Sequence, residues 1–269
     1  MMNPTDLRQI TSKGISEEQI NRQLEEFKLG FPYLKLEAAA TPTKGIVLMS
    51  GEEQEKVCNI WKTYQSGDHR VVKFVPASGA ASRMFKDLFA FLNGVNQEPA
   101  NDFEREFFDN IHDFAFFNEL NQNCEQNDGK SVDELMKDGD YKLIVDTLLN
   151  IRGLNYGQLP KGLLSFHKYD DGVRTPIEEH LVEAALYATS NKQAYVHFTI
   201  SHEHLELFKQ KVTEKIAQYE AKYDVKLNVS YSEQKPSTDT IAVNPDNSPF
   251  RNDDGSLLFR PGGHGALIE

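Results

Sequence analysis

The sequence predicts an α/β protein built on a parallel β-sheet, with helices ahead of the sheet and a helical segment inserted into it. Apolar, β-rich runs occur at 71–75, 194–200 and 225–231. Segments with helical spacing of apolar residues, 175–188 and 201–219, precede the second and third of these runs. Strands that alternate with helices pair in parallel, because each crossover helix returns the chain to the same end of the sheet.

Composition limits the class of partner. The chain has 269 residues, of which 39% are hydrophobic and 26% charged, so it can bury a core. Its 29 Lys and Arg against 41 Asp and Glu give a net charge of -12. Such a surface repels nucleic-acid backbones and anionic membranes, so we expect neither as a partner. A small anionic ligand can still bind in a local pocket that supplies backbone N–H groups or a few cations.

The sequence carries no sign of secretion or membrane insertion. It has no signal-peptide pattern at its start, and no apolar run near the ~18 residues that a membrane helix needs. Its two cysteines, Cys58 in an expected helix and Cys124 in a polar stretch, do not indicate a disulfide framework. We therefore expect a cytoplasmic protein.

Capping signals predict helices in the first quarter of the chain. Ser16 and Ser50 are each followed three residues later by Gln or Glu, and apolar residues then recur at helical spacing. We therefore expect a helical N-terminal extension at 1–68. The α/β core that follows it is expected at 69–94 and 158–269.

The segment 95–157 has helical spacing and no strand signal, so we expect a helical insertion that divides the core. Apolar residues at helical intervals predict one continuous helix near its start: Phe103, Phe107, Ile111 and Phe114. Ser131 begins a further capping box. We interpret the phenylalanines as core, and an exposed surface that binds a partner or a lipid as the minor alternative.

The last hundred residues contain the clearest helix start. Thr175 precedes Pro176 and stands three residues before Glu178, which combines an N-cap, a proline at the first helical position and a capping box. Ser201 is expected to cap the next helix. The stretch 232–269 is rich in Asn, Asp, Pro and Gly, so we expect loops there, and the sequence shows no internal repeat.

A loop of small residues follows the first strand and suggests a phosphate-binding site. Its members are Ala77, Ser78, Gly79, Ala80, Ala81 and Ser82. Backbone N–H groups in such a turn point to one spot, and the helix expected from Ser82 adds partial positive charge there. Arg83, in the expected first helical turn, can bind phosphate with two hydrogen bonds. The loop has neither the P-loop nor the dinucleotide-binding pattern, and a tight turn whose small residues only ease packing is equally compatible with it.

Two further segments contain residues suited to a nucleotide site. Lys161, between Pro160 and Gly162, can neutralise charge that develops on a phosphate, although a solvated loop lysine is the alternative. The glycines around His264, namely Gly262, Gly263 and Gly265, would let the backbone press against a base or sugar, although a flexible turn is the alternative.

The cluster His202-Glu203-His204 raises the possibility of a metal site. Residues two apart do not share a helix face, and no third ligand is evident nearby, so a surface cluster at a helix start is favoured. His197 alternates within a strand, which favours a packing role or a pocket wall.

Taken in chain order, these segments resemble the nucleotide-sugar pyrophosphorylases, especially the UDP-N-acetylhexosamine and UDP-sugar branch. The chain is also similar to a family of longer bacterial proteins of unknown function placed near these enzymes. The matching motifs are Ser78–Arg83, Pro160–Gly162, Thr175–Leu181, Glu233–Gln234, Asp254–Gly255 and Pro261–Leu267.

The resemblance implies a Rossmann-like GT-A nucleotidyltransferase sheet and a reaction. A sugar 1-phosphate would attack the α-phosphorus of a nucleoside triphosphate, expected to be UTP, with Mg²⁺ neutralising charge and pyrophosphate leaving. Arg83 and Lys161 would be the catalytic cations. The nucleotide would be held by residues 77–82 together with Gln234, Gly262, Gly263 and His264. Of these, Gln234 and Gly263 would hold the base, expected to be uracil.

The chain departs from the family pattern in three ways. The loop has one glycine, Gly79, where the family has two or three, and residues 84–159 separate Arg83 from the Pro-Lys motif. The family's metal-binding Asp lies beyond the Gly-x-Gly loop, whereas this sequence stops at Glu269, so we expect an incomplete sheet and identify no metal ligands. We expect transfer by a full-length form and little by this chain. The alternatives are an inactive nucleotide-binding or nucleotide-sugar-binding regulatory protein on the same fold, or an unrelated α/β protein.

Overall fold

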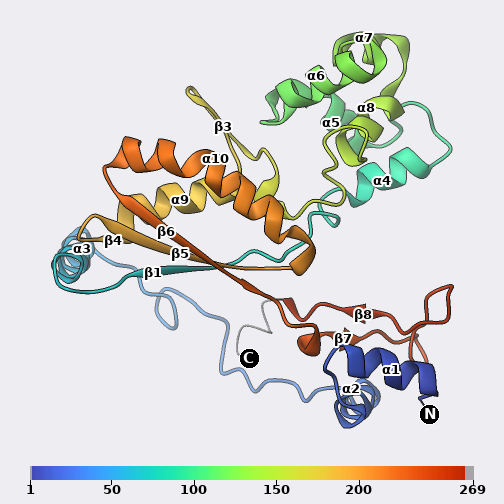
Figure 1. Cartoon of the computed structure of the whole chain (residues 1–269), viewed down its shortest axis with the longest axis horizontal. Helices are drawn as coiled ribbons and strands as arrows, with labels where there is room; N and C mark the ends of the chain where they lie inside the picture. The colour runs from blue at the N-terminus through green and yellow to red at the C-terminus, as the bar shows by residue number, and fades with distance from the viewer. Residues whose placement is uncertain (1, 264–269) are drawn as a thin grey trace. The chain divides into compact units, whose positions relative to one another are not determined.

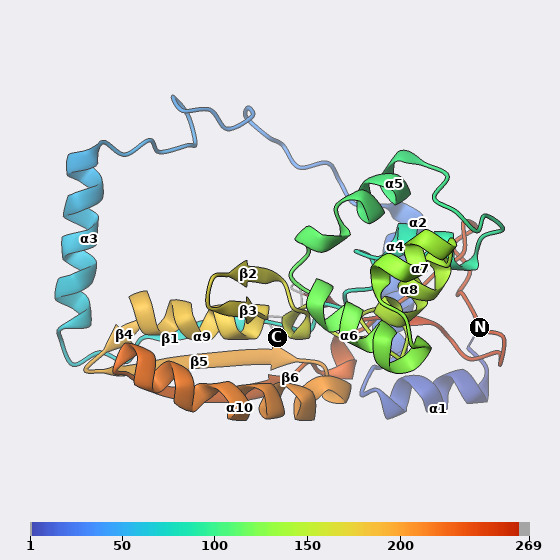
Figure 2. The same ribbon diagram turned by 90° about the horizontal axis from the view of Figure 1, so that it is seen from above.

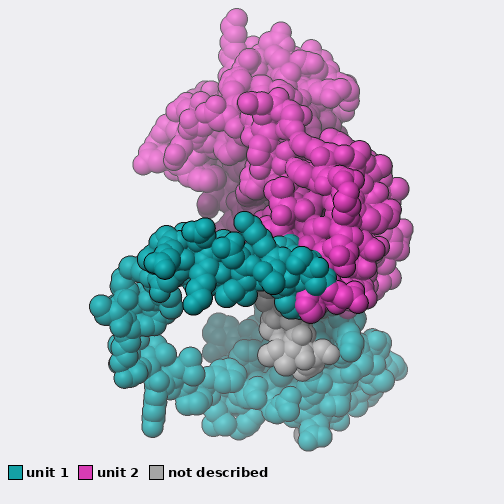
Figure 3. Space-filling model, turned by 90° about the vertical axis from the view of Figure 1, so that its left-hand side faces the viewer, with its two compact units in different colours: residues 1–67, 234–269 teal, residues 68–233 magenta. Residues whose placement is uncertain are grey.

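The computed structural model describes residues 2–263, which form two compact units (Figure 3). Unit 2 is the central segment Asp68–Glu233, and unit 1 is made from the two ends of the chain, up to Gly67 and from Gln234 onwards.

Unit 2 contains a sheet whose three long strands pair in parallel, with β5 in the middle (Figure 1). These strands are β1 (Val72–Pro76), β5 (Gln193–Ile200) and β6 (Lys226–Glu233). In the register of the sheet, Phe198 lies between Val75 and Tyr231. The short strand β4 (Thr189–Ser190) pairs antiparallel with the start of β5. The structure therefore confirms the mixed α/β class, the three expected strands and their parallel pairing.

Two helices pack on one face of this sheet (Figure 1), α9 (Pro176–Tyr187) and α10 (Leu205–Tyr223). Side chains alternate between the faces of a strand, and β5 buries one set against these helices: Ala194, Val196, Phe198 and Ile200. Helix α9 begins at the predicted capping box of Thr175 and Glu178. In unit 2, the opposite face carries Phe74, which is 54% exposed and stacks on the ring of His197.

Two helix starts differ from prediction. Ser201 does not cap α10, because the 3-10 turn η3 (His202–His204) comes first, and Ser201 Oγ lies 3.1 Å from His204 Nδ1. The helix expected from Ser82 begins at Lys86, since residues 82–85 form a turn that precedes α4 (Lys86–Asn93). Arg83 therefore stands before the helix and not in its first turn.

Between β1 and the hairpin β2–β3 the chain is helical, as expected. The helices are α4, α5 (Asp102–Asp109), η1 (Ile111–Asp113), α6 (Phe117–Asp128), α7 (Val132–Asp138), α8 (Tyr141–Leu149) and η2 (Lys161–Leu163). Their buried side chains form a hydrophobic cluster of their own that extends from Ala81 to Leu164.

The phenylalanine stripe does not form one continuous helix. Helix α5 ends at Asp109, and the 3-10 turn η1 follows after Asn110, whose backbone leaves helical geometry. The core interpretation still holds for the buried side chains of Phe107 and Ile111, and Phe107 contacts Phe114 with ring centroids 5.3 Å apart.

A hairpin that the sequence patterns did not reveal follows η2. It consists of β2 (His167–Tyr169) and β3 (Gly172–Arg174), and it lies beside α9 (Figure 2). Its strands have only three residues each and are mostly exposed, so they lack the alternation by which strands are recognised.

Unit 1 combines the N-terminal helices with loops from the end of the chain. Its helices are α1 (Pro4–Ser12), α2 (Glu17–Leu29), α3 (Gly51–Gln65) and η4 (Pro236–Thr238), and its strands are β7 (Thr240–Ile241) and β8 (Phe259–Arg260). Ser16 and Ser50 are the N-caps of α2 and α3, as predicted. A small core joins the chain ends: Ile10, Ile15, Ile20, Ile241 and Leu257.

None of the helices within residues 2–263 is long and apolar enough to cross a bilayer. Both cysteines are free thiols, Cys58 on the surface and Cys124 in the core of the helical segment.

Candidate functional site

The small-residue loop leaves the sheet at the carboxyl end of β1. The Ala77 N–H donates to the Thr199 carbonyl of β5 at 2.7 Å, which extends the pairing of the two strands by one residue. In open α/β sheets, ligands bind outside the carboxyl ends of the strands. The loop therefore lies at the edge of the sheet where this class of protein binds ligands.

The structure brings this loop together with Lys161, although residues 84–159 separate Arg83 from Pro160 in the sequence. The Lys161 N–H donates to the Gly79 carbonyl at 3.1 Å, and the Ala81 N–H donates to the Leu159 carbonyl at 3.3 Å. Ala80 and Pro160 thereby form an antiparallel bridge. The helical segment therefore leaves the loop and returns to it, so that two of the predicted site segments are neighbours.

The two cationic side chains of these segments are accessible to solvent. Arg83 and Lys161 are exposed, and within residues 2–263 neither side chain forms an ion pair. The backbone beside Lys161 is held against the core, because a Cβ atom at Gly162 would lie 2.9 Å from Cζ of the buried Phe208. Lys161 therefore combines a fixed main chain with a side chain in solvent.

The loop also offers backbone donors. In the part of the chain that the structure describes, the N–H groups of Gly79, Ala80 and Ser82 donate to no acceptor. Gly79 has open space where a side chain would project. Phe85, the N-cap residue of α4, supplies no side-chain acceptor to the first turn of that helix. N–H groups of this kind bind phosphate oxygens.

The segment after Lys161 is anchored by a buried tyrosine. The Tyr156 hydroxyl accepts a hydrogen bond from the Ser165 N–H at 2.9 Å and donates to Glu119 Oε2 at 3.4 Å. Burial raises the pKa of Tyr156 to about 12, so the hydroxyl keeps its proton. Ser165 Oγ also donates to Glu119, at 2.9 Å. These bonds hold the 160–165 segment in place beside the loop.

A row of polar side chains near the carboxyl ends of β5 and β6 was not predicted as part of a site. Ser232 Oγ lies 2.9 Å from Thr199 Oγ1 and 2.9 Å from His197 Nε2, while Ser230 Oγ lies 2.8 Å from His197 Nδ1. The sequence did contain a signal for this row. Polar residues alternate in both strands, which places these side chains on the same face of the sheet. Because Thr199 also pairs with Ala77, the row adjoins the loop.

The two histidines of the cluster, His202 and His204, have different partners. His202 Nδ1 lies 2.7 Å from Glu233 Oε2, whereas His204 Nδ1 lies near Ser201 Oγ. Within residues 2–263, no group of three or more His, Cys, Asp or Glu side chains is placed to hold a metal ion.

The remaining predicted residues belong to unit 1. Gln234 directly follows β6 and is the first residue of the C-terminal part of that unit, which also contains Gly262 and Gly263. Gly263 has a left-handed backbone with φ of +58°. His264 lies outside the described residues. Of the predicted site, the structure thus assembles the loop and Lys161 within unit 2.

Comparisons with known proteins give one family and no individual relative. Neither the curated proteins nor the solved structures include a significant match to this chain. A family model described as "Domain of unknown function (DUF4301)" matches residues 3–269, which is nearly the whole chain. The protein therefore belongs to the DUF4301 family.

Proposed function

We propose that this protein binds a nucleoside triphosphate at the loop 77–83 and Lys161, and that its activity is nucleotidyl transfer from UTP to a sugar 1-phosphate. The observation that carries the proposal is the pairing of Gly79 with Lys161 at the carboxyl edge of the sheet. This main-chain pairing joins Lys161 to a loop that has unpaired N–H groups and is followed directly by Arg83.

The three kinds of donor suit a polyphosphate in different ways. Backbone N–H groups bind oxygens without the entropy cost of ordering a side chain, and Arg83 can bind two oxygens of one phosphate at once. Lys161 acts as a point charge that stabilises the negative charge gathering as pyrophosphate departs. In the transfer step, a sugar phosphate oxygen forms a bond to the α-phosphorus while the bond from that phosphorus to the bridging oxygen breaks.

The resemblance also implies Mg²⁺. The residues of the candidate site do not form a site at which the protein itself would hold this ion. Mg²⁺ is commonly bound through one or two carboxylates together with substrate phosphates. At the carboxyl ends of β5 and β6, the candidate donors are His202 and Glu233, and these two pair with each other. Within the described part of the chain, no group of three or more such side chains is placed to hold a metal ion. We therefore derive no step through the metal.

A second candidate function is nucleotide binding without transfer. Two N–H groups of the loop, those of Ala77 and Ala81, already donate to main-chain carbonyls of the protein. The loop also has a single glycine, so methyl groups limit how closely a phosphate can approach the backbone. Both features limit the contacts that the loop can make with a reacting phosphate, and they favour binding without turnover.

The test combines binding and turnover. Isothermal titration calorimetry with UTP, ATP and UDP-sugars measures binding, and pyrophosphate release with a panel of sugar 1-phosphates and Mg²⁺ measures transfer. Release of pyrophosphate that depends on a sugar phosphate supports the enzyme. Binding without release supports the second candidate. Absence of binding by any nucleotide contradicts both.

A further inference from the structure

The polar row on the face of the sheet opposite α9 and α10 contains a histidine between two serines. His197 belongs to β5, and both serines belong to β6. Ser232 Oγ lies 2.9 Å from His197 Nε2, and Ser230 Oγ lies 2.8 Å from His197 Nδ1. Enzymes activate serine by placing it within about 2.6–3.2 Å of a base that a third group orients. The three side chains meet this geometric requirement.

The hydrogen bonds of Ser230 determine which ring nitrogen of His197 carries the proton. Ser230 Oγ lies 3.5 Å from the Val196 carbonyl, which can only accept, so the serine hydroxyl donates to it. The Ser230 oxygen then accepts from Nδ1–H, which leaves Nε2 as an acceptor that faces Ser232. Thr199 Oγ1 lies 2.9 Å from Ser232 Oγ and can donate to it. The hydroxyl proton of Ser232 is thereby directed to Nε2.

The imidazole is held in place and can still be reached by a ligand. The ring of Phe74 in β1 stacks on the ring of His197, with centroids 5.2 Å apart and an angle of 18° between the planes. The side chains of His197 and Ser232 are half-buried, while those of Ser230 and Phe74 are exposed. A ligand that reaches Ser232 therefore also finds apolar surface beside the imidazole.

A second serine–histidine contact in unit 2 lacks the orienting group. Ser201 Oγ lies 3.1 Å from His204 Nδ1, and the two residues are neighbours in one short turn. In the part of the chain that the structure describes, no side chain forms a hydrogen bond with Nε2 of His204. The contact of His197 with Ser232 is therefore distinguished by the second serine on the other ring nitrogen.

We propose that Ser232 is a nucleophile that accepts an acyl group, that His197 is its general base, and that the substrate is a carboxylic ester. Ser230 is the positioning residue, and it supplies a neutral hydroxyl where many serine–histidine sites have a carboxylate. The ring of Phe74 offers apolar surface to the acyl chain. The proposal does not depend on nucleotide binding, because it is drawn from side chains of the three long strands alone.

The reaction has two steps. Ser232 Oγ forms a bond to the carbonyl carbon of the ester while its proton passes to His197 Nε2, and the imidazolium gives that proton to the alcohol oxygen as the ester C–O bond breaks. Water then forms a bond to the same carbon, with His197 taking a proton from the water. That proton passes to Ser232 Oγ as the acyl-serine bond breaks, and the carboxylic acid is released.

The experiment treats the full chain with p-nitrophenyl acetate, measures release of p-nitrophenol, and maps the acetylated residue by peptide mass spectrometry after an acid quench. The acetyl group is expected on Ser232. Ser232→Ala and His197→Gln are each expected to lower the rate of release by about a hundredfold or more. Ser230→Ala is expected to lower it by about tenfold, because the imidazole loses its orientation. Ser230→Thr keeps the hydroxyl and is expected to retain most of the rate.

The matched control is Ser201→Ala, which removes the hydroxyl of the other serine–histidine contact and is expected to leave the rate unchanged. Circular dichroism checks that each variant is folded. No release above the rate in buffer, or acetylation confined to other residues, would overturn the proposal. An undiminished rate in folded Ser232→Ala protein would overturn it as well. If that rate still depended on His197, the imidazole itself would be the nucleophile.

Discussion

At the scale of single residues, Glu178 joins the two helices that cover the sheet. Its side chain is 3% exposed, and its Oε2 accepts hydrogen bonds from the Thr175 N–H at 2.9 Å and hydroxyl at 3.0 Å. Oε1 accepts from the Tyr219 hydroxyl of α10 at 3.0 Å and lies 3.4 Å from Lys215 Nζ. Burial raises the pKa of Glu178, but these hydrogen bonds and the lysine charge outweigh it and hold the pKa below its ordinary value of 4.5.

Glu178→Gln is therefore expected to destabilise the protein by about 2 kcal/mol, because an amide cannot accept all of these hydrogen bonds. The pKa of Glu178 is lower in the folded than in the unfolded chain. Its contribution is therefore present above about pH 4.5 and is lost as the pH falls through the folded-state value. Urea unfolding followed by circular dichroism between pH 7 and pH 3 should show a smaller acid loss in the variant. The exposed control Glu206→Gln should leave stability unchanged, and equal acid losses in Glu178→Gln and the unmodified protein would contradict this account.

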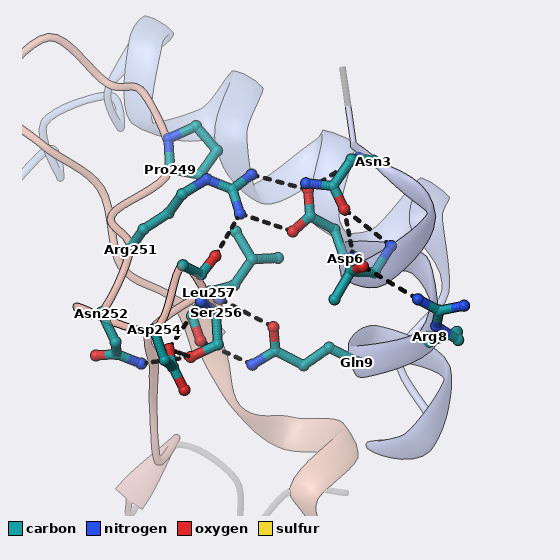
Figure 4. Close-up of polar contacts among 12 residues, drawn as sticks. Asn3, Asp6, Arg8, Gln9, Pro249, Arg251, Asn252, Asp254, Ser256 and Leu257 are labelled. Carbon is teal, nitrogen blue, oxygen red and sulfur yellow. Dashed lines mark hydrogen bonds and ion pairs between the residues drawn. The ribbon is translucent and has the colours of Figure 1, made fainter.

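A second buried carboxylate ties the chain ends together. Both oxygens of Asp6 in α1 accept hydrogen bonds from Arg251, each at 2.8 Å, and Oδ2 also accepts from the Asn3 N–H at 2.9 Å (Figure 4). The hydrogen bonds from Arg251 are the main cause of a lowered pKa at Asp6, which is 1% exposed. Lysine cannot reproduce this two-pronged contact.

Arg251→Lys is expected to reduce the hydrogen-exchange protection of the α1 amides, and Arg251→Ala to reduce it further, because Asp6 is left buried without its partner. Hydrogen exchange of the α1 amides, which reports on unit 1 alone, is the measurement. Arg8→Ala, which removes an exposed arginine from the same helix, is the control. Unchanged α1 protection in Arg251→Ala would show that the ion pair does not hold the chain ends together.

At the scale of elements, two glycines of the candidate site have different roles. Gly162 is needed for packing, whereas Gly79 is expected to contact the ligand. Gly162→Ala would bring a Cβ atom within 2.9 Å of the Phe208 ring, so we expect a loss of roughly 1–3 kcal/mol in the free energy of unfolding. Gly79→Ala meets open space, so its stability should change by less than ~0.5 kcal/mol.

The same two variants also test nucleotide binding. Gly79→Ala is expected to reduce nucleotide affinity because a methyl group blocks the approach of phosphate to the backbone. Thermal unfolding and calorimetry on both variants are the measurements. A stable Gly79→Ala protein with undiminished nucleotide affinity would argue against a phosphate beside this residue.

Elements with strong local signals could be predicted from the sequence. Strands β1, β5 and β6 have apolar runs or alternation, and α9 has a capping box that the structure forms in full. The hairpin β2–β3 and helix α6 lack such signals. The break after α5 was missed because the apolar spacing continues past Asn110, while the backbone turns there and still buries Ile111 in the same cluster.

At the scale of the whole molecule, the site depends on contacts distant in sequence. Local patterns identified the loop and Lys161 separately. Their adjacency follows from the way the helical segment closes on itself at Ala80 and Pro160, which no local pattern encodes.

The central claim is that Arg83 and Lys161 bind the phosphates of one nucleotide. Calorimetric titration of UTP into the unmodified protein, Arg83→Ala, Lys161→Ala and the exposed control Lys168→Ala tests it most directly. The account predicts that the first two substitutions each weaken UTP binding by about tenfold or more without unfolding the protein, because each removes a charge-assisted hydrogen bond, and that the control does not. Equal UTP affinity in all four folded proteins, or no binding to any of them, would contradict it.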